Sequence, residues 1–160
     1  MKEYSELDST DLAILDILQT SSNISNVELG RQVQLSPPAI HARIRRLEEL
    51  GYIQGYSAQL NREHLGFDML CFIQISLQVH KTADIDTFVQ AIIALPEVLE
   101  CHQVTGEFDY LLKVIVRNRR ALHRFLMEKL TPMPSVTRIQ TSLALTEIKS
   151  TTVLPLDQEA

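Results

Sequence analysis

The stretch that decides the fold of the first half of the chain is Ser36-Pro37-Pro38-Ala39-Ile40-His41-Ala42-Arg43-Ile44-Arg45-Arg46-Leu47-Glu48-Glu49-Leu50-Gly51. Ser36 is a typical N-cap, and Pro37 suits the first helical position, where the amide it lacks would have no partner. Gly51 is a typical C-terminal stop. The apolar residues between them recur at intervals of four and three residues: Ile40, Ile44, Leu47 and Leu50. This spacing predicts one helix with one buried face.

Two shorter helices are predicted upstream of this stretch. Asp8 can cap the first, whose apolar stripe comprises Leu12, Ile14, Leu15, Ile17 and Leu18. Ser25 can cap the second, with Glu28 completing a capping box. Gly30 inside that helix costs about 1 kcal/mol relative to alanine, so we expect a neighbouring helix to approach it closely. Two short helices, a turn over residues 34–36 and a third helix predict a helix-turn-helix.

The third helix has the residue types of a DNA-reading helix. Small or polar groups near its start and arginines further along suit insertion into the major groove. The predicted DNA-contacting residues are Ser36, Pro38, Ala39, His41, Ala42, Arg43, Arg45 and Arg46. A plain three-helix bundle with a solvated basic face is the alternative. Net charge favours that alternative, because the chain carries −5 and DNA-binding domains are usually basic.

Composition describes an ordinary globular protein of one medium or two small domains. Hydrophobic residues make up 45% of the 160 residues and charged residues 22%. No apolar run approaches the roughly 20 residues that span a membrane, and no secretion signal is evident, so we expect a cytoplasmic protein without a membrane partner. Cys71 and Cys101 form no C-x-x-C pair, and the five histidines lack metal-ligand spacing. We therefore expect two buried free thiols, no metal and no cofactor.

The second half of the chain alternates in a way typical of strands separated by helices. Strands are predicted from residue 69 to 80, over 98–104, over 110–116 and over 136–148, with helices capped by Asp84 and Asn118. The order βαββαβ predicts a ferredoxin-like domain with helices on one face of its sheet. In the second and third strands, apolar residues occupy both sets of alternating positions, so both faces of the sheet are apolar. We therefore expect two copies to pair as a homodimer through the face without helices. The predicted α+β chain comprises residues 1–56, a linker over 57–68 and a second domain over 69–160.

The hairpin over residues 104–110 is a candidate ligand site. Gly106 permits a sharp turn and close approach of a ligand. Thr105 and Asp109 offer a hydroxyl and a carboxylate, which suit the two ends of a zwitterion, and Glu107 is the other acid available. On the residues alone, a glycine-containing hairpin is most often only a hairpin. Asp109 can equally stabilise the turn by accepting backbone amides.

Several blocks of the sequence resemble the Lrp/AsnC (feast/famine) family of transcription regulators. In the first half these are Glu28-Leu29, Leu35-Ser36, Arg43-Ile44-Arg45-Arg46-Leu47-Glu48 and Gly51-Tyr52-Ile53, and in the second half Leu95-Pro96-Glu97-Val98, Val104-Thr105-Gly106-Glu107 and Asp109-Tyr110-Leu111-Leu112. The resemblance implies a winged helix-turn-helix followed by a RAM-type domain that oligomerises and senses a small molecule. It implies a sequence-specific regulator of double-stranded DNA, a homodimer that assembles into tetramers or octamers, and no enzyme activity.

The resemblance also implies an effector site, with an amino acid such as leucine or methionine as its ligand. The residues that it places there are Thr105, Gly106, Glu107, Asp109, Tyr110, Ile139 and Thr141. Two positions depart from the family pattern. Gln34 replaces a turn glycine, which would cost about 1 kcal/mol at positive φ, and Ile139 replaces a residue that is often polar. An architectural DNA-binding protein of the same fold without a ligand is the alternative.

Overall fold

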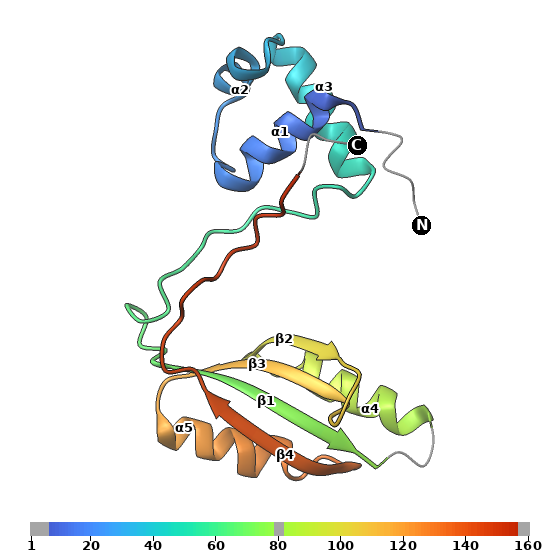
Figure 1. The fold of residues 1–160 in the computed structure, drawn as a ribbon, viewed down its shortest axis with the longest axis vertical. Helices are drawn as coiled ribbons and strands as arrows, with labels where there is room; N and C mark the ends of the chain where they lie inside the picture. Colours follow the sequence, from blue (N-terminus) through green and yellow to red (C-terminus); the bar gives the residue numbers. More distant parts are fainter. Residues whose placement is uncertain (1–6, 79–81, 157–160) are drawn as a thin grey trace. The chain divides into compact units, whose positions relative to one another are not determined.

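The computed structural model describes residues 7–78 and 82–156, and the chain divides into two compact units. The N-terminal unit comprises the residues up to Gln59 together with the residues from Lys149 onward. The sheet unit is Leu60–Ile148. Figure 1 shows the elements of both units. The C-terminal residues therefore belong with the helices, whereas the sequence had placed them in one domain over residues 69–160.

The N-terminal unit is built from α1 (Ser9–Thr20), α2 (Asn26–Val33) and α3 (Pro37–Glu49). As predicted, Asp8 and Ser25 are N-caps, and each side chain accepts the backbone N–H three residues further on. At α1 the bond is reciprocated, because the Asp11 carboxylate accepts the amide of Asp8. The buried core of the unit is Ile14, Leu18, Leu29, Ile40 and Leu47. This arrangement confirms the predicted helix-turn-helix.

The turn between α2 and α3 depends on two unusual backbone positions. Gln34 adopts the left-handed conformation, with φ 58° and ψ 40°. A Cβ added to Gly30 would lie 2.5 Å from the carbonyl oxygen of Leu35 and 3.5 Å from Ile40. The predicted close approach at Gly30 is confirmed, but the nearest group is the backbone of the turn rather than a helix. Both residues allow α3 to start tightly against α2.

The sheet unit has the predicted βαββαβ order. Its strands are β1 (Met69–Leu77), β2 (Val98–Gln103), β3 (Tyr110–Val116) and β4 (Val136–Leu143), arranged antiparallel in the order β2-β3-β1-β4. The helices are α4 (Thr82–Ile93) and α5 (Arg119–Arg124), which continues as the π-helix η1 (Phe125–Leu130). Asp84 therefore lies in the first turn of α4 and does not cap it. The last strand ends at Leu143, earlier than the predicted residue 148.

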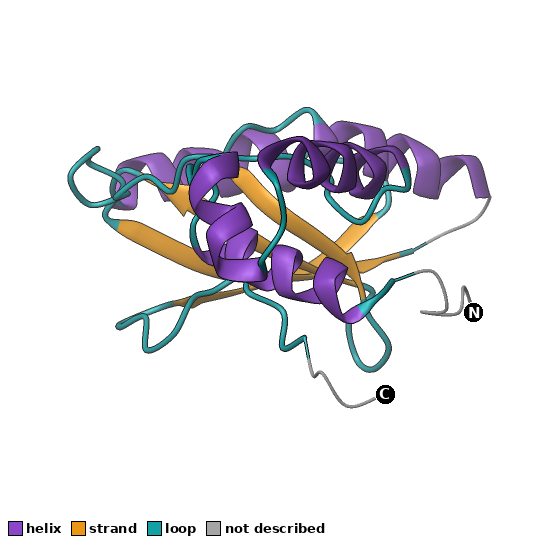
Figure 2. Ribbon diagram, turned by 90° about the horizontal axis from the view of Figure 1, so that it is seen from above, coloured by secondary structure: helices purple, strands orange, loops and turns teal. Residues whose placement is uncertain are grey.

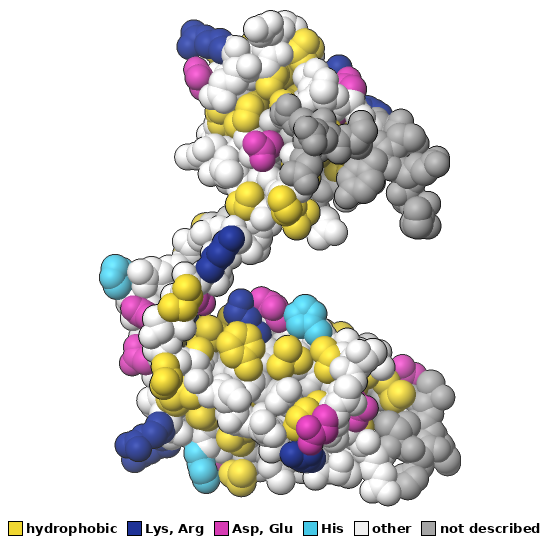
Figure 3. Space-filling model, in the orientation of Figure 1, with side chains coloured by type: hydrophobic (Ala, Val, Ile, Leu, Met, Phe, Trp, Pro, Cys, Tyr) yellow, Lys and Arg dark blue, Asp and Glu magenta, His cyan; other side chains and the backbone are white. Residues whose placement is uncertain are grey.

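Helices α4 and α5 lie on the same face of the sheet (Figures 1 and 2). The core beneath them comprises Cys71, Ile73, Ile75, Phe88, Ile92, Tyr110, Leu112, Val114, Val116, Phe125 and Leu130. The opposite face mixes apolar and charged side chains (Figure 3). Phe72 is 39% exposed there, opposite Lys113 of β3 and Ser142 of β4. Lys113 in turn forms an ion pair with Glu100 of β2.

The two cysteines lie in different environments, and one of the two predictions about them is wrong. Cys71 is a buried free thiol, as expected, and burial raises its pKa. Cys101 is an exposed free thiol. The reason is its position on β2, which lies at the edge of the described sheet beside β3. Within the described ranges, no cluster of three or more His, Cys, Asp or Glu side chains could hold a metal ion, and no helix is long and apolar enough to span a membrane.

Candidate DNA and effector sites

One face of α3 is exposed and has the spacing of a recognition surface. Pro38, His41, Ala42, Arg45 and Glu49 are exposed, at intervals of three and four residues that place them along one stripe, and Pro37, Arg46 and Glu48 are also exposed on the helix. The Arg45 side chain is 71% exposed and contacts Glu49 at 2.9 Å. Ser36 begins the helix in N-cap geometry but its hydroxyl makes no capping bond, and Ala39 is half-buried. Of the three predicted arginines, only Arg45 lies on this stripe.

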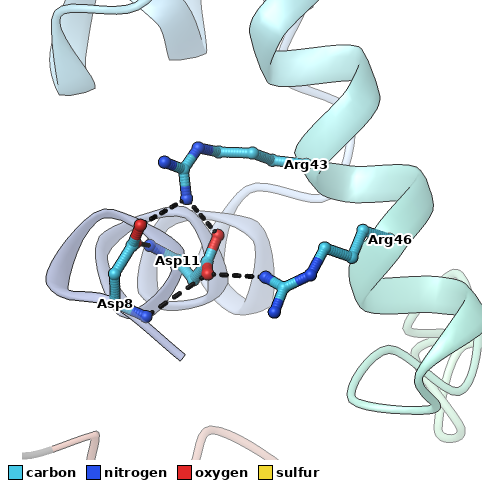
Figure 4. Close-up of polar contacts among 4 residues, drawn as sticks. All are labelled: Asp8, Asp11, Arg43 and Arg46. Carbon is cyan, nitrogen blue, oxygen red and sulfur yellow. Dashed lines mark hydrogen bonds and ion pairs between the residues drawn. The ribbon is translucent and has the colours of Figure 1, made fainter. Parts of the chain in front are cut away.

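Arg43 and Arg46 point instead toward the first turn of α1 (Figure 4). Arg43 contacts Asp8 at 2.8 Å and Asp11 at 2.7 Å. Arg46 contacts the other oxygen of Asp11 at 3.0 Å. The Asp11 side chain is only 1% exposed, so it is a buried carboxylate held between two arginines of the neighbouring helix.

These charges stabilise one another and fix α3 on α1. The pKa of Asp8 is lowered, first by the hydrogen bond from the Asp11 amide and then by the one from Arg43. The pKa of Arg43 is raised by its hydrogen bonds to Asp8 and Asp11. A buried charge is tolerated only when it is paired and hydrogen-bonded, which Asp11 is. The geometry therefore gives Arg43 and Arg46 a structural role; DNA contact by either remains a prediction.

In the sheet unit, Asp109 is bound to the backbone at the end of β1. One carboxylate oxygen of Asp109 accepts the amide of Leu77 at 2.7 Å. Its own amide donates to the carbonyl of Ile75 at 3.0 Å, and its carbonyl accepts the amide of Val104 at 2.9 Å. These bonds close the hairpin and join it to the neighbouring strand. They match the turn-stabilising alternative for Asp109.

Glu107 and Arg138 form the exposed charged pair of this hairpin. A carboxylate oxygen of Glu107 contacts a guanidinium nitrogen of Arg138, and the two side chains are 69% and 53% exposed. The Arg138 guanidinium also stacks over the ring of Phe108, 4.7 Å from its centroid. Among the described residues, an added Cβ at Gly106 would meet nothing within 4 Å, so the backbone there is open toward them. Arg138 was missed from the sequence, because it lies 31 residues from Glu107 and only the strand register reveals their proximity.

The other predicted effector residues are distributed between the hairpin and the core. Thr105 is exposed in the hairpin beside Gly106. Tyr110 is 5% exposed and packs on Phe88, with ring centroids 4.9 Å apart, and burial raises its pKa. Ile139 and Thr141 lie opposite Ile75 and Ile73 in the register, so they face the helix-covered side. The structure thus brings Thr105, Gly106, Glu107 and Asp109 together, and places Tyr110 and Ile139 in or against the core.

A helix-turn-helix with one exposed helical stripe, joined to a ferredoxin-like sheet with a charged hairpin, defines the class of two-domain regulators that bind DNA and a small molecule. Two family descriptions match the chain: "Winged helix-turn-helix DNA-binding" over residues 7–54 and "Lrp/AsnC ligand binding domain" over residues 70–154. The chain belongs to the Lrp/AsnC family. It is a DNA-binding transcription regulator with a ligand-binding domain, and not an enzyme.

Relatives of known name and structure agree with this assignment. The leucine-responsive regulatory proteins of Escherichia coli and Klebsiella pneumoniae are each 42% identical over 144 residues, which is 90% of this chain and 88% of theirs. A transcriptional regulator from Neisseria meningitidis, solved in complex with L-methionine, aligns with a TM-score of 0.91 at 36% identity, over 94% of this chain and 97% of that one. AsnC of Escherichia coli aligns with a TM-score of 0.85 at 28% identity, over 93% and 99% of the two chains.

Proposed function

We propose that this regulator binds operator DNA through the exposed stripe of α3, and that an amino acid bound at the 104–110 hairpin modulates this binding. The observation that carries the effector half of the proposal is the Glu107–Arg138 pair beside the open backbone of Gly106. The methionine complex of the Neisseria relative supports an amino acid as the ligand. Leucine and methionine are therefore the first candidates.

The DNA half of the proposal follows from the geometry of α3. Pro38 and Ala42 have short side chains, and His41 is polar, so this part of the helix surface can approach base edges. Arg45 can reach a phosphate. The hydroxyl of Ser36 makes no capping hydrogen bond, so it is available to contact the DNA backbone. The ion pairs of Asp11 hold α3 in place against α1, so the stripe is presented by a rigid support. Sequence-specific reading by these positions is our proposal.

The charges at the hairpin are complementary to a free amino acid. A zwitterion loses water from its ammonium and its carboxylate on binding, so each end needs a charged or hydrogen-bonding partner. Glu107 can accept the ammonium, and the guanidinium of Arg138 has donors beyond the nitrogen that contacts Glu107. An exposed ion pair is worth only about 0–1 kcal/mol, so its rearrangement around a ligand costs little. Asp109 is left out of this set because one of its carboxylate oxygens accepts the amide of Leu77, which gives the residue a structural role.

We also propose that two copies pair through the face of the sheet that has no helices. Phe72 is a large apolar side chain exposed near the centre of that face, between β3 and β4. Pairing would bury Phe72 and the neighbouring half-buried Leu111. A dimer would present two α3 stripes to half-sites about one helical turn of DNA apart. Tetramers or octamers of such dimers are the assemblies that we expect.

The test combines a ligand screen with two charge-removing variants. A thermal-shift screen of the twenty amino acids identifies a binder, and calorimetry then measures its affinity for Glu107→Gln, Arg138→Gln and the control Arg120→Gln, an exposed arginine on α5. We expect both hairpin variants to lose at least about tenfold in affinity, the effect of removing one charged hydrogen bond, while the control keeps it. If no amino acid binds while operator DNA does, the architectural alternative without a ligand is correct.

A further inference from the structure

The C-terminal segment over residues 149–156 is attached to the end of α1. The side-chain amide of Gln19 donates to the carbonyl of Leu154 at 2.9 Å and accepts the amide of Leu154 at 2.8 Å. These paired bonds join residues that are 135 positions apart in the chain. A primary amide matches the donor and acceptor of one backbone residue, so Gln19 holds Leu154 as a neighbouring strand would.

The C-terminal segment also borders a groove of the N-terminal unit. A groove on the N-terminal unit is lined by Leu12, Leu15 and Leu18 of α1, by Tyr52, and by Leu154 and Leu156 of the C-terminal segment. Leu154 and Leu156 thus border the same groove as these leucines of α1, and Leu154 is 66% exposed. The contact lies entirely within the N-terminal unit, to which the residues from Lys149 onward belong. The segment is part of this unit although it follows the last strand of the sheet.

Helix α1 therefore makes two separate attachments at its two ends. Near its start, Asp11 holds Arg43 and Arg46 of α3. Near its end, Gln19 holds Leu154. Asp11 and Gln19 are about 12 Å apart along the helix axis, eight residues at 1.5 Å each. The helix fixes the spacing of these two attachment points.

We infer that the C-terminal segment is a strap that couples the sheet unit to the recognition helix α3. The strap is hydrogen-bonded to α1 through Gln19, and α1 is joined to α3 through the ion pairs of Asp11. The sheet unit Leu60–Ile148 is joined to the N-terminal unit at both of its ends, by the chain after Gln59 and by the chain before Lys149. A second connection restricts the motion that a single linker permits. As a means by which effector binding reaches α3, the strap rests on the proposed function.

The first experiment measures the strap without DNA or effector. Hydrogen exchange is compared among the full chain, a chain truncated after Ile148, Gln19→Ala and the control Gln32→Ala. Gln32 is exposed on α2, and its side chain hydrogen-bonds to Glu28 of the same helix. We expect α1 and α3 amides to exchange about three- to tenfold faster in Gln19→Ala, the change that corresponds to one or two surface hydrogen bonds. The truncated chain should show at least the same increase, and β1 and β3 should be unchanged in all variants.

The second experiment measures affinity for a mixed-sequence DNA duplex at low salt. We expect Gln19→Ala and the truncated chain to bind at least about threefold more weakly than Gln32→Ala, because α3 is less ordered before binding. Exchange in α1 and α3 equal to that of Gln32→Ala would overturn the strap. Faster exchange in α1 alone, with α3 and DNA affinity unchanged, would overturn the coupling to α3. A full chain that binds no DNA would overturn the proposed function, while the exchange comparison would still decide whether the strap exists.

Discussion

Two ion-pair clusters of this protein use the same chemistry in different surroundings. Around Asp11 a carboxylate that is 1% exposed is shared by Arg43 and Arg46. At the hairpin Glu107 and Arg138 pair while more than half of each side chain faces solvent. Because the first cluster is buried, its ion pairs contribute to the stability of the N-terminal unit. Exposure leaves the charges of the second free to rearrange, which is what a binding site for a charged ligand requires.

Magnitudes support this distinction. Removing one partner of a buried ion pair costs about 3–5 kcal/mol, because a charge is left without compensation. Exposed pairs contribute about 0–1 kcal/mol. The two arginines beside Asp11 are partly exposed, so water can solvate them when the carboxylate is removed. The cost at Asp11 should therefore fall below the range for a fully buried pair.

The largest effect is expected from removing the buried carboxylate. Asp11→Ala should lower the free energy of unfolding of the N-terminal unit by about 2–3 kcal/mol, through the lost ion pairs and the lost half of the capping box. Urea denaturation followed by circular dichroism measures the change. Glu107→Ala, which removes the exposed acid, should cost less than about 1 kcal/mol. An equal loss of unfolding free energy in the two variants would show that the buried and the exposed cluster contribute alike to stability.

A smaller effect is expected at Asp109, an acid in the same hairpin as Glu107 with a structural role. Asp109→Ala leaves the amide of Leu77 without its partner and should destabilise the sheet unit by about 1–2 kcal/mol. Asp68→Ala, an exposed acid before β1, is the control and should cost less than about 0.5 kcal/mol. Thermal unfolding compares them. A stable Asp109→Ala protein with tenfold weaker amino-acid binding would instead make Asp109 a ligand residue.

We expect two arginines of α3 to differ in effect, one on DNA affinity and the other on stability. Arg45→Gln should weaken DNA binding and reduce the slope of log affinity against log salt by about one, the value for one lost phosphate contact. Its melting temperature should fall only slightly, because the exposed pair with Glu49 is worth about 0.3–0.5 kcal/mol. Arg43→Gln should show the reverse pattern, because its partners are Asp8 and Asp11. Fluorescence anisotropy over a range of salt concentrations measures both slopes. An equal flattening by Arg43→Gln would show that this arginine contacts DNA.

The smallest effect concerns the turn that leads into α3. Gln34→Gly should raise the free energy of unfolding by up to about 1 kcal/mol, because Gln34 has φ 58° and glycine adopts this conformation without strain. Gln32→Gly, two residues earlier inside α2, should lower it by about 0.5–1 kcal/mol. Chemical denaturation gives both values. Opposite signs at the two positions would confirm that backbone conformation, and not the loss of a glutamine, is responsible.

Local sequence rules predicted the elements well. Ser36-Pro37 and the spacing of Ile40, Ile44 and Leu47 predicted α3. The positive φ of Gln34 was indicated by the family resemblance and not by a local rule, because the family usually has glycine in this turn. Alternating apolar residues predicted the strands of the sheet. These signals act over a few residues, and a single sequence contains them in full.

The contacts that define the sites could not be predicted in the same way. Asp11 and Arg43 are 32 residues apart, as are Leu77 and Asp109. Arg43 and Arg45 both lie on the polar side of the α3 pattern, and only the position of α1 decides which of them is paired. Hydrophobic periodicity identifies a buried face but not the partner of a charged side chain. The C-terminal segment gave no signal, because one amide side chain and two leucines form no pattern.

The division of the chain also has a consequence for protein synthesis. The N-terminal unit combines residues before Leu60 with residues from Lys149 onward, which the ribosome adds later. All of Leu60–Ile148 is translated between them. At about 5–20 residues per second, this delay is on the order of 4 to 18 seconds. The nascent chain can therefore order its sheet before the segment that begins at Lys149 reaches the DNA-binding unit.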